Sequence, residues 1–227
     1  MRTNALRVAV TLALGIFGAA CEAQAATIDF TSLIWSGASG KSSFSASTLF
    51  DGIKVTVSST SGLLTFNSGG DVNSGCVAGT GGLACKGDGL GVGDDEVTSG
   101  SERLNVYFSA PVSITGLGFL DLFGPPSNKS GDAAAETARW YVYSPSQSSS
   151  QSVTGTDQTS TLGYKAVSTS YTNVTQLRFY ATTPTNSDFA LASIKIAPSK
   201  VAEPATLLLS GIGFVFLSSF RSRRRSS

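Results

Sequence analysis

The sequence of 227 residues contains no histidine. It therefore lacks the Ser-His-Asp and Cys-His arrangements of many hydrolases, the usual proton shuttle at neutral pH, and nearly every histidine-based zinc site. Charged residues are also few, at 14%, which excludes a strongly charged disordered chain and a long heptad coiled coil. This composition disfavours most familiar enzymes, and we expect a protein that is not an enzyme.

The formal net charge of +1 hides an uneven distribution of charge along the chain. From Ala26 to Lys200, ten Lys and Arg residues stand against thirteen Asp and Glu residues, which gives this part a net charge of −3. The sequence shows no basic cluster in this part, whereas a nucleic-acid-binding domain carries one. We therefore expect no nucleic-acid partner.

Residues 1–25 are typical of a secretory signal peptide. Basic residues precede a largely apolar run at residues 8–20, and small residues occupy positions −3 and −1 of a cleavage site, Ala23 and Ala25. The pattern predicts cleavage after Ala25 and export across the inner membrane. The alternatives are a buried N-terminal helix and a lipoprotein in which Cys21 is the lipidated residue.

The C-terminal segment joins a short motif, an uncharged apolar run and a basic end. The motif, residues 201–206, begins with Val201, Ala202, Glu203 and Pro204. Residues 205–220 carry no charge. As a transmembrane helix they would span about 24 Å, slightly less than a hydrocarbon core of about 30 Å. Four arginines within residues 221–227 then place the body outside the cytoplasm by the positive-inside rule: Arg221, Arg223, Arg224 and Arg225. A buried core helix is the alternative.

This tail, residues 200–227, resembles the PEP-CTERM sorting signal of Gram-negative bacteria. Glu203 and Pro204 match its motif, whereas Ala202 stands where the family usually has its first proline. The resemblance implies that an exosortase, a membrane protease-transpeptidase, recognises the tail as its substrate. The protein would then be anchored transiently in the membrane and would finally reach the cell surface or the extracellular space. The resemblance also implies a bacterium that makes exopolysaccharide, which could be a partner. An ordinary single-pass anchor is the alternative.

Residues 26–199 predict one all-β domain, an antiparallel β-sandwich of jelly-roll type. Clusters of Gly, Ser, Asn and Pro separate segments that alternate in polarity or are rich in β-branched and aromatic residues. The expected strands are Thr27–Leu33, Ile53–Ser58, Leu104–Phe108, Val112–Leu122, Arg139–Tyr143, Val174–Ala181 and Phe189–Ile196. Parts of this domain also resemble a pattern that is common ahead of PEP-CTERM tails, and that pattern implies no activity. The matching residues are Gly89–Val92, Asp95, Glu96, Glu102–Phe108, Val112–Leu122 and Phe189–Ile196.

Cys76 and Cys85 are the only cysteines of the expected mature chain, with eight residues between them. In an oxidising compartment such a pair is expected to form a disulfide. Closing this loop would stabilise the fold by about 2–3 kcal/mol. Zinc is the alternative, but two cysteines without histidine supply only half of the ligands that it needs.

The acidic residues of a glycine-rich stretch supply the oxygen ligands that Ca²⁺ takes: Asp88, Asp94, Asp95 and Glu96. Their spacing does not fit an EF-hand loop, and a solvated acidic turn is the alternative. Apart from such a structural Ca²⁺, we expect no cofactor. Paired carboxylates could also support glycoside hydrolysis, with Asp95 or Glu96 and Glu102 as candidates.

The leading hypothesis is therefore an exported, non-catalytic surface or matrix protein. The alternative is a carbohydrate-binding module or adhesin, and a glycoside-active enzyme is the third hypothesis. For the binding hypothesis, aromatic side chains could form a sugar platform, although aromatic residues of sandwich strands also serve as core. The candidates are Trp35, Trp140, Tyr141 and Tyr143.

Overall fold

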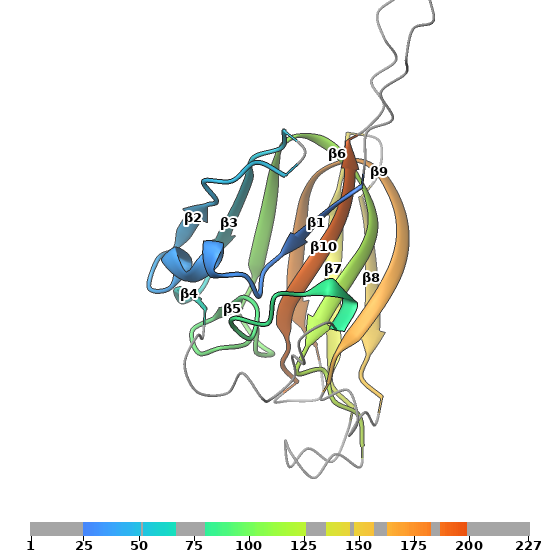
Figure 1. Cartoon of the computed structure of the whole chain (residues 1–227). Helices are drawn as coiled ribbons and strands as arrows, with labels where there is room; N and C mark the ends of the chain where they lie inside the picture. The colour runs from blue at the N-terminus through green and yellow to red at the C-terminus, as the bar shows by residue number, and fades with distance from the viewer. Residues whose placement is uncertain are drawn as a thin grey trace, which may run out of the picture.

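A computed structural model describes residues 25–50, 52–66, 80–125, 135–145, 148–156, 163–182 and 187–198 (Figure 1). Ten of its regular elements are strands and two are short 3-10 elements. In chain order the elements are β1 (Ala26–Asp29), the 3-10 helix η1 (Leu33–Ala38), β2 (Ser43–Ser45), β3 (Val55–Ser59), β4 (Leu64–Thr65), the 3-10 turn η2 (Thr80–Gly82), β5 (Gly91–Val92), β6 (Leu104–Leu120), β7 (Thr137–Tyr143), β8 (Ser148–Thr154), β9 (Lys165–Ala181) and β10 (Ala190–Pro198).

Eight of the strands form one sheet, and every strand pair in it is antiparallel. Its main path runs β1-β10-β6-β9-β7-β8, and β3 pairs with both β2 and β6. Strands β4 and β5 form a separate two-stranded sheet. The expected all-β class with antiparallel strands is therefore confirmed.

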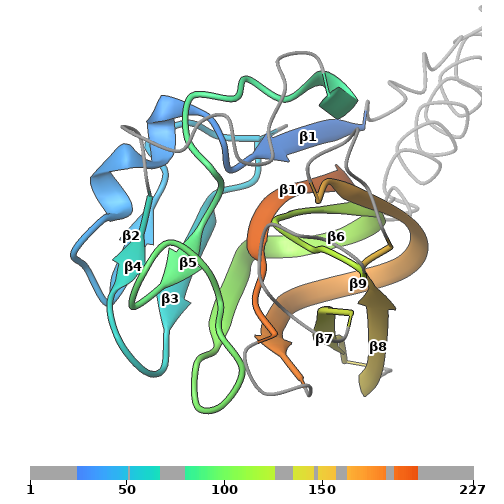
Figure 2. The same ribbon diagram turned by 90° about the horizontal axis from the view of Figure 1, so that it is seen from below.

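The long strands β6 and β9 run through both halves of the molecule: the half that contains β3 and the half that contains β1 and β10. The first part of β6, residues 104–108, pairs with β3, and its last part, residues 112–120, pairs with β10. Register shifts between Tyr107 and Gly116 interrupt the ladder of β6 with β9, and such irregularities bend a sheet. Figure 2 shows β6 and β9 curving from one half to the other. The sheet thus folds over on itself like a sandwich.

One hydrophobic core fills the space between the two halves, with residues from η1, β1, β3, β6, β7, β9 and β10. Strand β7 shows why these residues form a strand of this kind: its burial alternates residue by residue. Because successive side chains of a strand point to opposite faces, Ala138, Trp140 and Val142 face the core and their neighbours face outward. This alternation is the signal from which the sequence predicted a sandwich.

The structure changes several of the expected strand boundaries. The expected strand Thr27–Leu33 ends at Asp29, and η1 begins at Leu33. Val112–Leu122 ends at Leu120, because Asp121 has a φ of 54° in the left-handed region and turns the chain. The segments 104–108 and 112–122, expected as two strands, form the single strand β6.

The two terminal regions lie outside the described residues. These regions contain the signal cleavage residues Ala23 and Ala25, the sorting motif, the apolar run at 205–220 and the four arginines of residues 221–227. Within the described ranges, no helix has the length and apolarity needed to cross a bilayer.

Candidate functional site

The outward face of β6, β9 and β7 carries tyrosine, arginine and amide side chains, and we call it the Tyr–Arg face. Residues directly opposite each other in an antiparallel ladder point to the same side of the sheet. The register therefore places these side chains in three rows across three strands. The first row is Arg103, Tyr180 and Arg139; the second is Asn105, Arg178 and Tyr141; the third is Tyr107, Gln176 and Tyr143.

Neighbouring strands extend the rows with small hydroxyl side chains. Thr56 and Ser58 of β3 lie opposite Tyr107 and Asn105. On the other side, β8 contributes a serine to each row, Ser152, Ser150 and Ser148. Across these five strands the rows contain no Asp or Glu. The result is a broad face that combines aromatic rings, hydrogen-bonding groups and positive charge.

Asn105 holds the centre of the Tyr–Arg face in place, although its side chain is fully buried. Its Oδ1 accepts hydrogen bonds from Nε of Arg178 at 2.9 Å and from Nε2 of Gln176 at 3.3 Å. Its Nδ2 donates to the carbonyl oxygen of Ser58 at 3.4 Å. A buried amide is stable when its donors and acceptor are satisfied, and here that satisfaction also orients the guanidinium of Arg178.

The tyrosines are arranged by ring and cation contacts. The rings of Tyr141 and Tyr180 stack with centroids 5.5 Å apart, and the guanidinium of Arg103 lies 4.9 Å from the Tyr180 ring centroid. Arg178 lies 5.4 Å from the centroid of Tyr143. Burial, and next a side-chain hydrogen bond with Tyr141, raise the pKa of Tyr180 above its ordinary value of 10. Its hydroxyl therefore stays protonated at neutral pH.

The sequence-based aromatic platform was partly wrong. Trp35 and Trp140 are core residues with relative exposures of 0% and 2%. Tyr141 is exposed at 39%, and Tyr143 is partly buried on the same outward face. Trp140 cannot share a face with Tyr141, because adjacent residues of a strand point to opposite sides. The outward face contains Tyr107, also exposed at 39%, and not Trp140.

The glycine-rich acidic stretch forms a tight loop beside the start of β10. Leu90 bridges to Leu191, and the N–H of Val97 donates to the carbonyl oxygen of Phe189. The loop is closed so tightly that a Cβ on Gly91 would lie 2.3 Å from the carbonyl carbon of Asp95. Only glycine fits at this position without moving the backbone.

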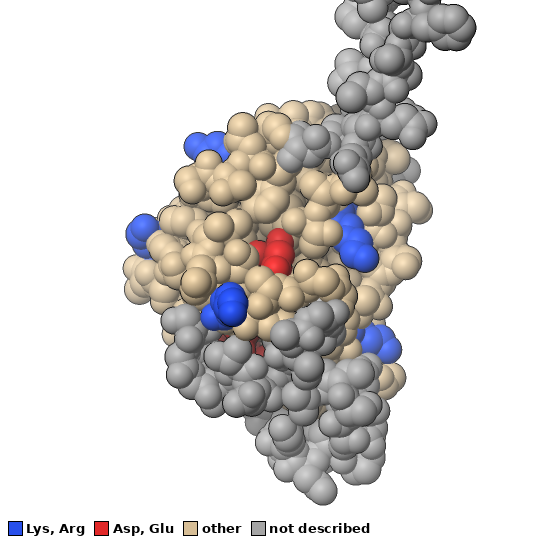
Figure 3. Space-filling view, in the orientation of Figure 1, with Lys and Arg blue, Asp and Glu red and all other residues tan. Residues whose placement is uncertain are grey.

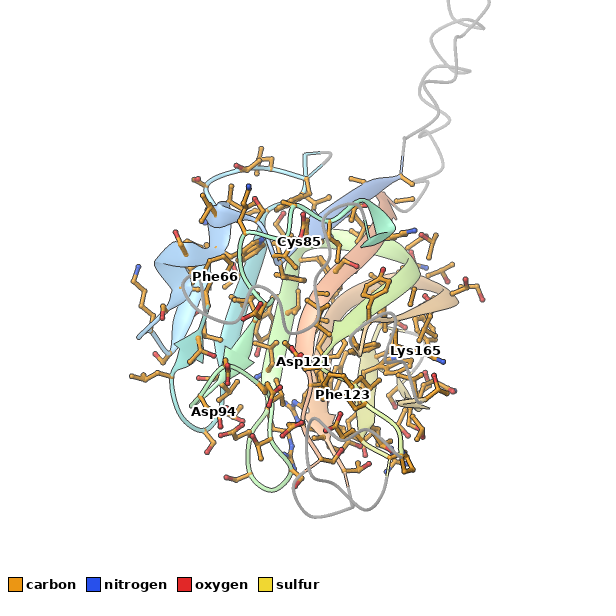
Figure 4. All side chains as sticks on the ribbon, turned by 60° about the horizontal axis from the view of Figure 1, so that its bottom comes forward. Phe66, Cys85, Asp94, Asp121, Phe123 and Lys165 are labelled. Carbon is orange, nitrogen blue, oxygen red and sulfur yellow. The ribbon has the colours of Figure 1, made fainter. Side chains whose placement is uncertain are left out.

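This loop brings Glu96 to acidic residues from distant parts of the sequence. Its partly buried carboxyl makes a side-chain hydrogen bond with Asp188. Burial is the main cause that raises the pKa of Glu96 from 4.5 to about 10, and nearby negative charges add to it, those of Asp188, Asp121 and Asp95. Glu96 is therefore protonated at neutral pH. Figure 4 shows Asp94 on the outer part of the loop and Asp121 nearer the middle of the same end.

The four residues expected to bind Ca²⁺ lie along this loop in different environments. Asp88 is buried at 4% exposure, Asp94 is exposed, and Asp95 and Glu96 are partly buried. Oδ1 of Asp94 accepts the N–H of Glu96 at 3.2 Å. Among the described residues, no group of three or more acidic, histidine or cysteine side chains is arranged to hold a metal ion. The Ca²⁺ site stays a prediction.

Glu102, the other candidate for glycoside hydrolysis, supports the same loop. Its Oε2 accepts the N–H of Thr98 at 2.7 Å. Burial raises the pKa of this carboxyl above its ordinary value, while the hydrogen bond from Thr98 opposes the shift. A carboxylate that accepts a backbone N–H in this way organises a turn, so the structural role explains the environment of Glu102.

Cys85 is disulfide-bonded, and its segment docks on the β1 end of the sheet. The N–H of Cys85 donates to Oγ1 of Thr31, and Oδ2 of Asp29 accepts the N–H of Ala84. Cys76 lies outside the described residues, so its pairing with Cys85 stays a prediction.

Basic side chains that are scattered along the sequence come together on the folded surface. On the face seen in Figure 3, the Lys and Arg side chains lie apart from one another, and acidic atoms show near the middle. By contrast, Arg103, Arg139 and Arg178 meet on the Tyr–Arg face, because their strands pair there. These three arginines are far apart in the sequence, and only strand register brings them together.

Sequence reasoning missed several residues of both sites. In the Tyr–Arg face it missed Asn105, Arg178 and Tyr180, whose signal was the alternation of polar and apolar residues along their strands. In the acidic loop it missed Asp188 as a neighbour of Glu96. No local sequence signal could find that residue, because 92 positions separate the two in the chain.

Comparisons with known proteins identify no family. No family model matches the chain, and no curated protein matches it. Among solved structures, a match is found to the crystal structure of an F5/8 type C domain from Bacteroides fragilis, with 17% sequence identity and a TM-score of 0.31. The match covers 43% of this chain and 66% of the Bacteroides domain. A similarity of this size carries no argument about fold or function.

Proposed function

We propose that this chain is an exported, non-catalytic surface or matrix protein that binds polysaccharide through its Tyr–Arg face. The observation that carries the proposal is the arrangement of tyrosine, arginine and amide side chains in three rows on one outward sheet face. Tyrosine combines an apolar ring, which can pack against the C–H surface of a sugar, with a hydroxyl that hydrogen-bonds. Amide and guanidinium groups add the directional hydrogen bonds that sugar hydroxyls require.

The face is also organised before any ligand binds. Asn105 fixes Arg178 and Gln176 through its Oδ1, and Tyr141 stacks on Tyr180. Side chains that are already held lose little freedom on binding, which favours affinity. An open sheet face across several strands suits a polymer that lies along it better than it suits a small molecule, which is usually bound in a concave pocket.

Export and sorting form the second part of the proposal. The disulfide at Cys85 supports an oxidising compartment, where such bonds persist. The signal-peptide pattern and the PEP-CTERM-like tail support passage across the inner membrane, transient anchoring and processing by an exosortase. A polysaccharide-binding module suits that destination, because the sorting signal is associated with bacteria that make exopolysaccharide.

Loss of the Tyr141 ring tests the binding part. We expect Tyr141→Ala to weaken polysaccharide binding about tenfold, because a central aromatic contact contributes upwards of about 1 kcal/mol and about 1.4 kcal/mol corresponds to a factor of ten. Tyr141→Phe keeps the ring and should lose less. Affinity electrophoresis in a panel of neutral and acidic polysaccharides measures the effect.

Leu33→Ala is the matched control, because Leu33 is an exposed apolar residue of η1, at 56% exposure, and lies outside the Tyr–Arg face. It should bind as the wild type does. Circular dichroism and the melting temperature show whether each variant is folded. Absence of binding to every polymer of the panel, or full binding by a folded Tyr141→Ala protein, contradicts the proposal.

The sorting motif is tested separately. In a host that contains an exosortase, the double change Glu203→Ala and Pro204→Ala should block C-terminal processing, while Ser199→Ala, outside the motif, should leave it in place. The intact mass of the mature protein measures the outcome. Normal processing of the double variant would reject exosortase sorting and favour an ordinary single-pass anchor.

A further inference from the structure

We propose that the polymer recognised by the Tyr–Arg face is anionic, with carboxylate groups repeated along its chain. This inference rests on the proposed function and adds the chemical class of the ligand. It follows from the charge of the face, from the way its arginines are held, and from their spacing.

The Tyr–Arg face is positively charged, whereas the domain as a whole has a negative net charge. The part of the sequence from Ala26 to Lys200 has a net charge of −3, yet the three rows contain three arginines and no carboxylate. Within the described part of the chain, none of these arginines forms an ion pair. A positive face without internal counter-charges attracts anions and disfavours cations.

Two of the three guanidinium groups are held in a way that leaves them able to bind a carboxylate through paired N–H donors, whereas Nη1 of Arg103 already donates to the carbonyl oxygens of Gly100 and Glu102. Arg178 uses Nε to donate to Asn105 and lies over the ring of Tyr143. Its two Nη groups make no hydrogen bond to the described residues, and guanidinium groups pair with carboxylates through two parallel N–H donors. Arg139 is exposed and forms no side-chain hydrogen bond in the described ranges.

The spacing of the arginines favours a repeated ligand. Arg103 and Arg139 flank Tyr180 in one row. Because neighbouring strands are about 4.8 Å apart, the two arginine positions are separated by about 10 Å, with an aromatic ring between them. The Tyr180 ring is itself buried, at 8% exposure, against Tyr141 and Arg103. A chain of acidic sugars can place a ring on the exposed Tyr141 of the next row and carboxylates on the two arginines, whereas a single small anion contacts only one of them.

Single-stranded nucleic acid is the other polymer that combines rings with negative charge. The disulfide-bonded Cys85 favours a polysaccharide, because disulfides persist outside the reducing cytoplasm. The experiment therefore includes nucleic acid as an outcome.

The test compares polygalacturonate with its methyl ester, which keeps the same sugar backbone but replaces each carboxylate by a neutral methyl ester. Binding of the full mature chain is measured by isothermal titration at low and high salt. We expect wild-type protein to bind the acid form at least about tenfold more tightly than the ester, and the difference to shrink at high salt because exposed charges are screened.

Arg139→Gln removes one positive charge from the face, and Lys195→Gln removes one exposed charge from β10 as the control. We expect Arg139→Gln to weaken binding of the acid form about fivefold and binding of the ester by clearly less, because only the acid form loses an ion pair, with no effect of Lys195→Gln on either polymer. The change at position 139 is exposed and should not disturb folding.

The outcomes separate the two proposals. Equal binding of the acid form and the ester, with no effect of Arg139→Gln, overturns the anionic class but leaves polysaccharide binding standing. Binding of neither these nor any other polysaccharide overturns the proposed function itself. Tighter binding to a single-stranded DNA oligonucleotide than to polygalacturonate overturns the inference in favour of nucleic acid.

Discussion

Replacing Glu96 by Gln should make the protein more stable at pH 8 and leave its stability nearly unchanged at pH 4. The folded state raises the pKa of Glu96 from 4.5 to about 10, chiefly by burial and then by the charge of Asp188. A glutamine has the shape of the protonated acid and an N–H donor that can reach Asp188. The variant therefore keeps the contact without the cost of holding a proton.

The direction of this pH dependence follows from the pH at which the folded and the unfolded protein each release the proton of Glu96. Below the unfolded pKa of 4.5, both states of the wild type hold the proton, and the contribution of Glu96 to stability is at its maximum. Between 4.5 and about 10 the unfolded chain releases the proton while the folded protein keeps it. The free energy of unfolding therefore falls with rising pH, by at most about 1.4 kcal/mol per pH unit.

Urea unfolding at intervals from pH 4 to pH 9, in the presence of EDTA, measures this slope. Asp94→Asn is the control, because it removes an exposed carboxylate of the same loop and keeps an acceptor for the N–H of Glu96. Its pH dependence should follow that of the wild type. A wild-type stability that is flat over this range, with no gain from Glu96→Gln at pH 8, would show that Glu96 is ionised in the folded protein.

Gly91→Ala is expected to destabilise the protein by about 3 kcal/mol, at the upper end of the cost of inserting a methyl group into a packed site. The new Cβ would lie 2.3 Å from the carbonyl carbon and oxygen of Asp95 and 2.4 Å from the nitrogen of Glu96. All three are backbone atoms, so no side chain can rotate to make room. The loop must open, and the hydrogen bond between Val97 and Phe189 lies next to the change.

Gly40→Ala separates this steric effect from the backbone cost of replacing a glycine. Gly40 has a φ of 77°, but nothing lies within 4 Å of its added Cβ. We expect a loss of about 1–2 kcal/mol there, from the left-handed backbone alone. Gly91 lies outside the left-handed region, so a loss at position 91 that is no larger than at position 40 contradicts the close approach. The free energies of unfolding of the two variants are compared by urea denaturation, with the same dependence on urea concentration fitted to both.

The sequence predicted those parts of the fold that depend on local alternation. The strands near Val55, Trp140 and Ile194 follow from apolar residues at every second position, since these residues pack on one core. The continuity of β6 did not follow from the sequence, because Pro111 and the polar residues around it suggest a break. The strand continues there because pairing with β9 resumes at Val112 after the register shift.

Strand β8 shows the limit of pattern reading in another way. The sequence from Ser148 to Thr154 is rich in serine and has no apolar face, so it suggests a polar connection. It forms a strand because all seven of its residues pair with β7. Only Val153 of this edge strand packs against the core, and the other residues are exposed or partly buried. Such a strand needs no hydrophobic alternation, and its ladder depends on a neighbour that local composition cannot reveal.

In the candidate site, too, local alternation could be read from the sequence and pairing between strands could not. Alternation along β7 places Tyr141 and Tyr143 on one face, and the same rule places Trp140 on the other. The sequence alone could therefore have separated them. The approach of Arg178 to both Asn105 and Tyr141 depends on the register of β9 with two different strands, and register depends on packing across the whole sheet. For the same reason, Glu96 and Asp188 could not be paired from sequence.

The position of β10 has a mechanical consequence. This strand is hydrogen-bonded to β1 on one side and to β6 on the other, and Ala26 pairs with Ile196 near the place where the described chain ends. If the tail after Pro198 is the membrane anchor that we propose, it is joined to the module through an interior strand. Drag on a captured polymer would load two hydrogen-bonded ladders together, whereas an edge strand would peel away one bond at a time. In the proposed anchored form, this strand order would let the module carry tension between the cell surface and a bound polymer.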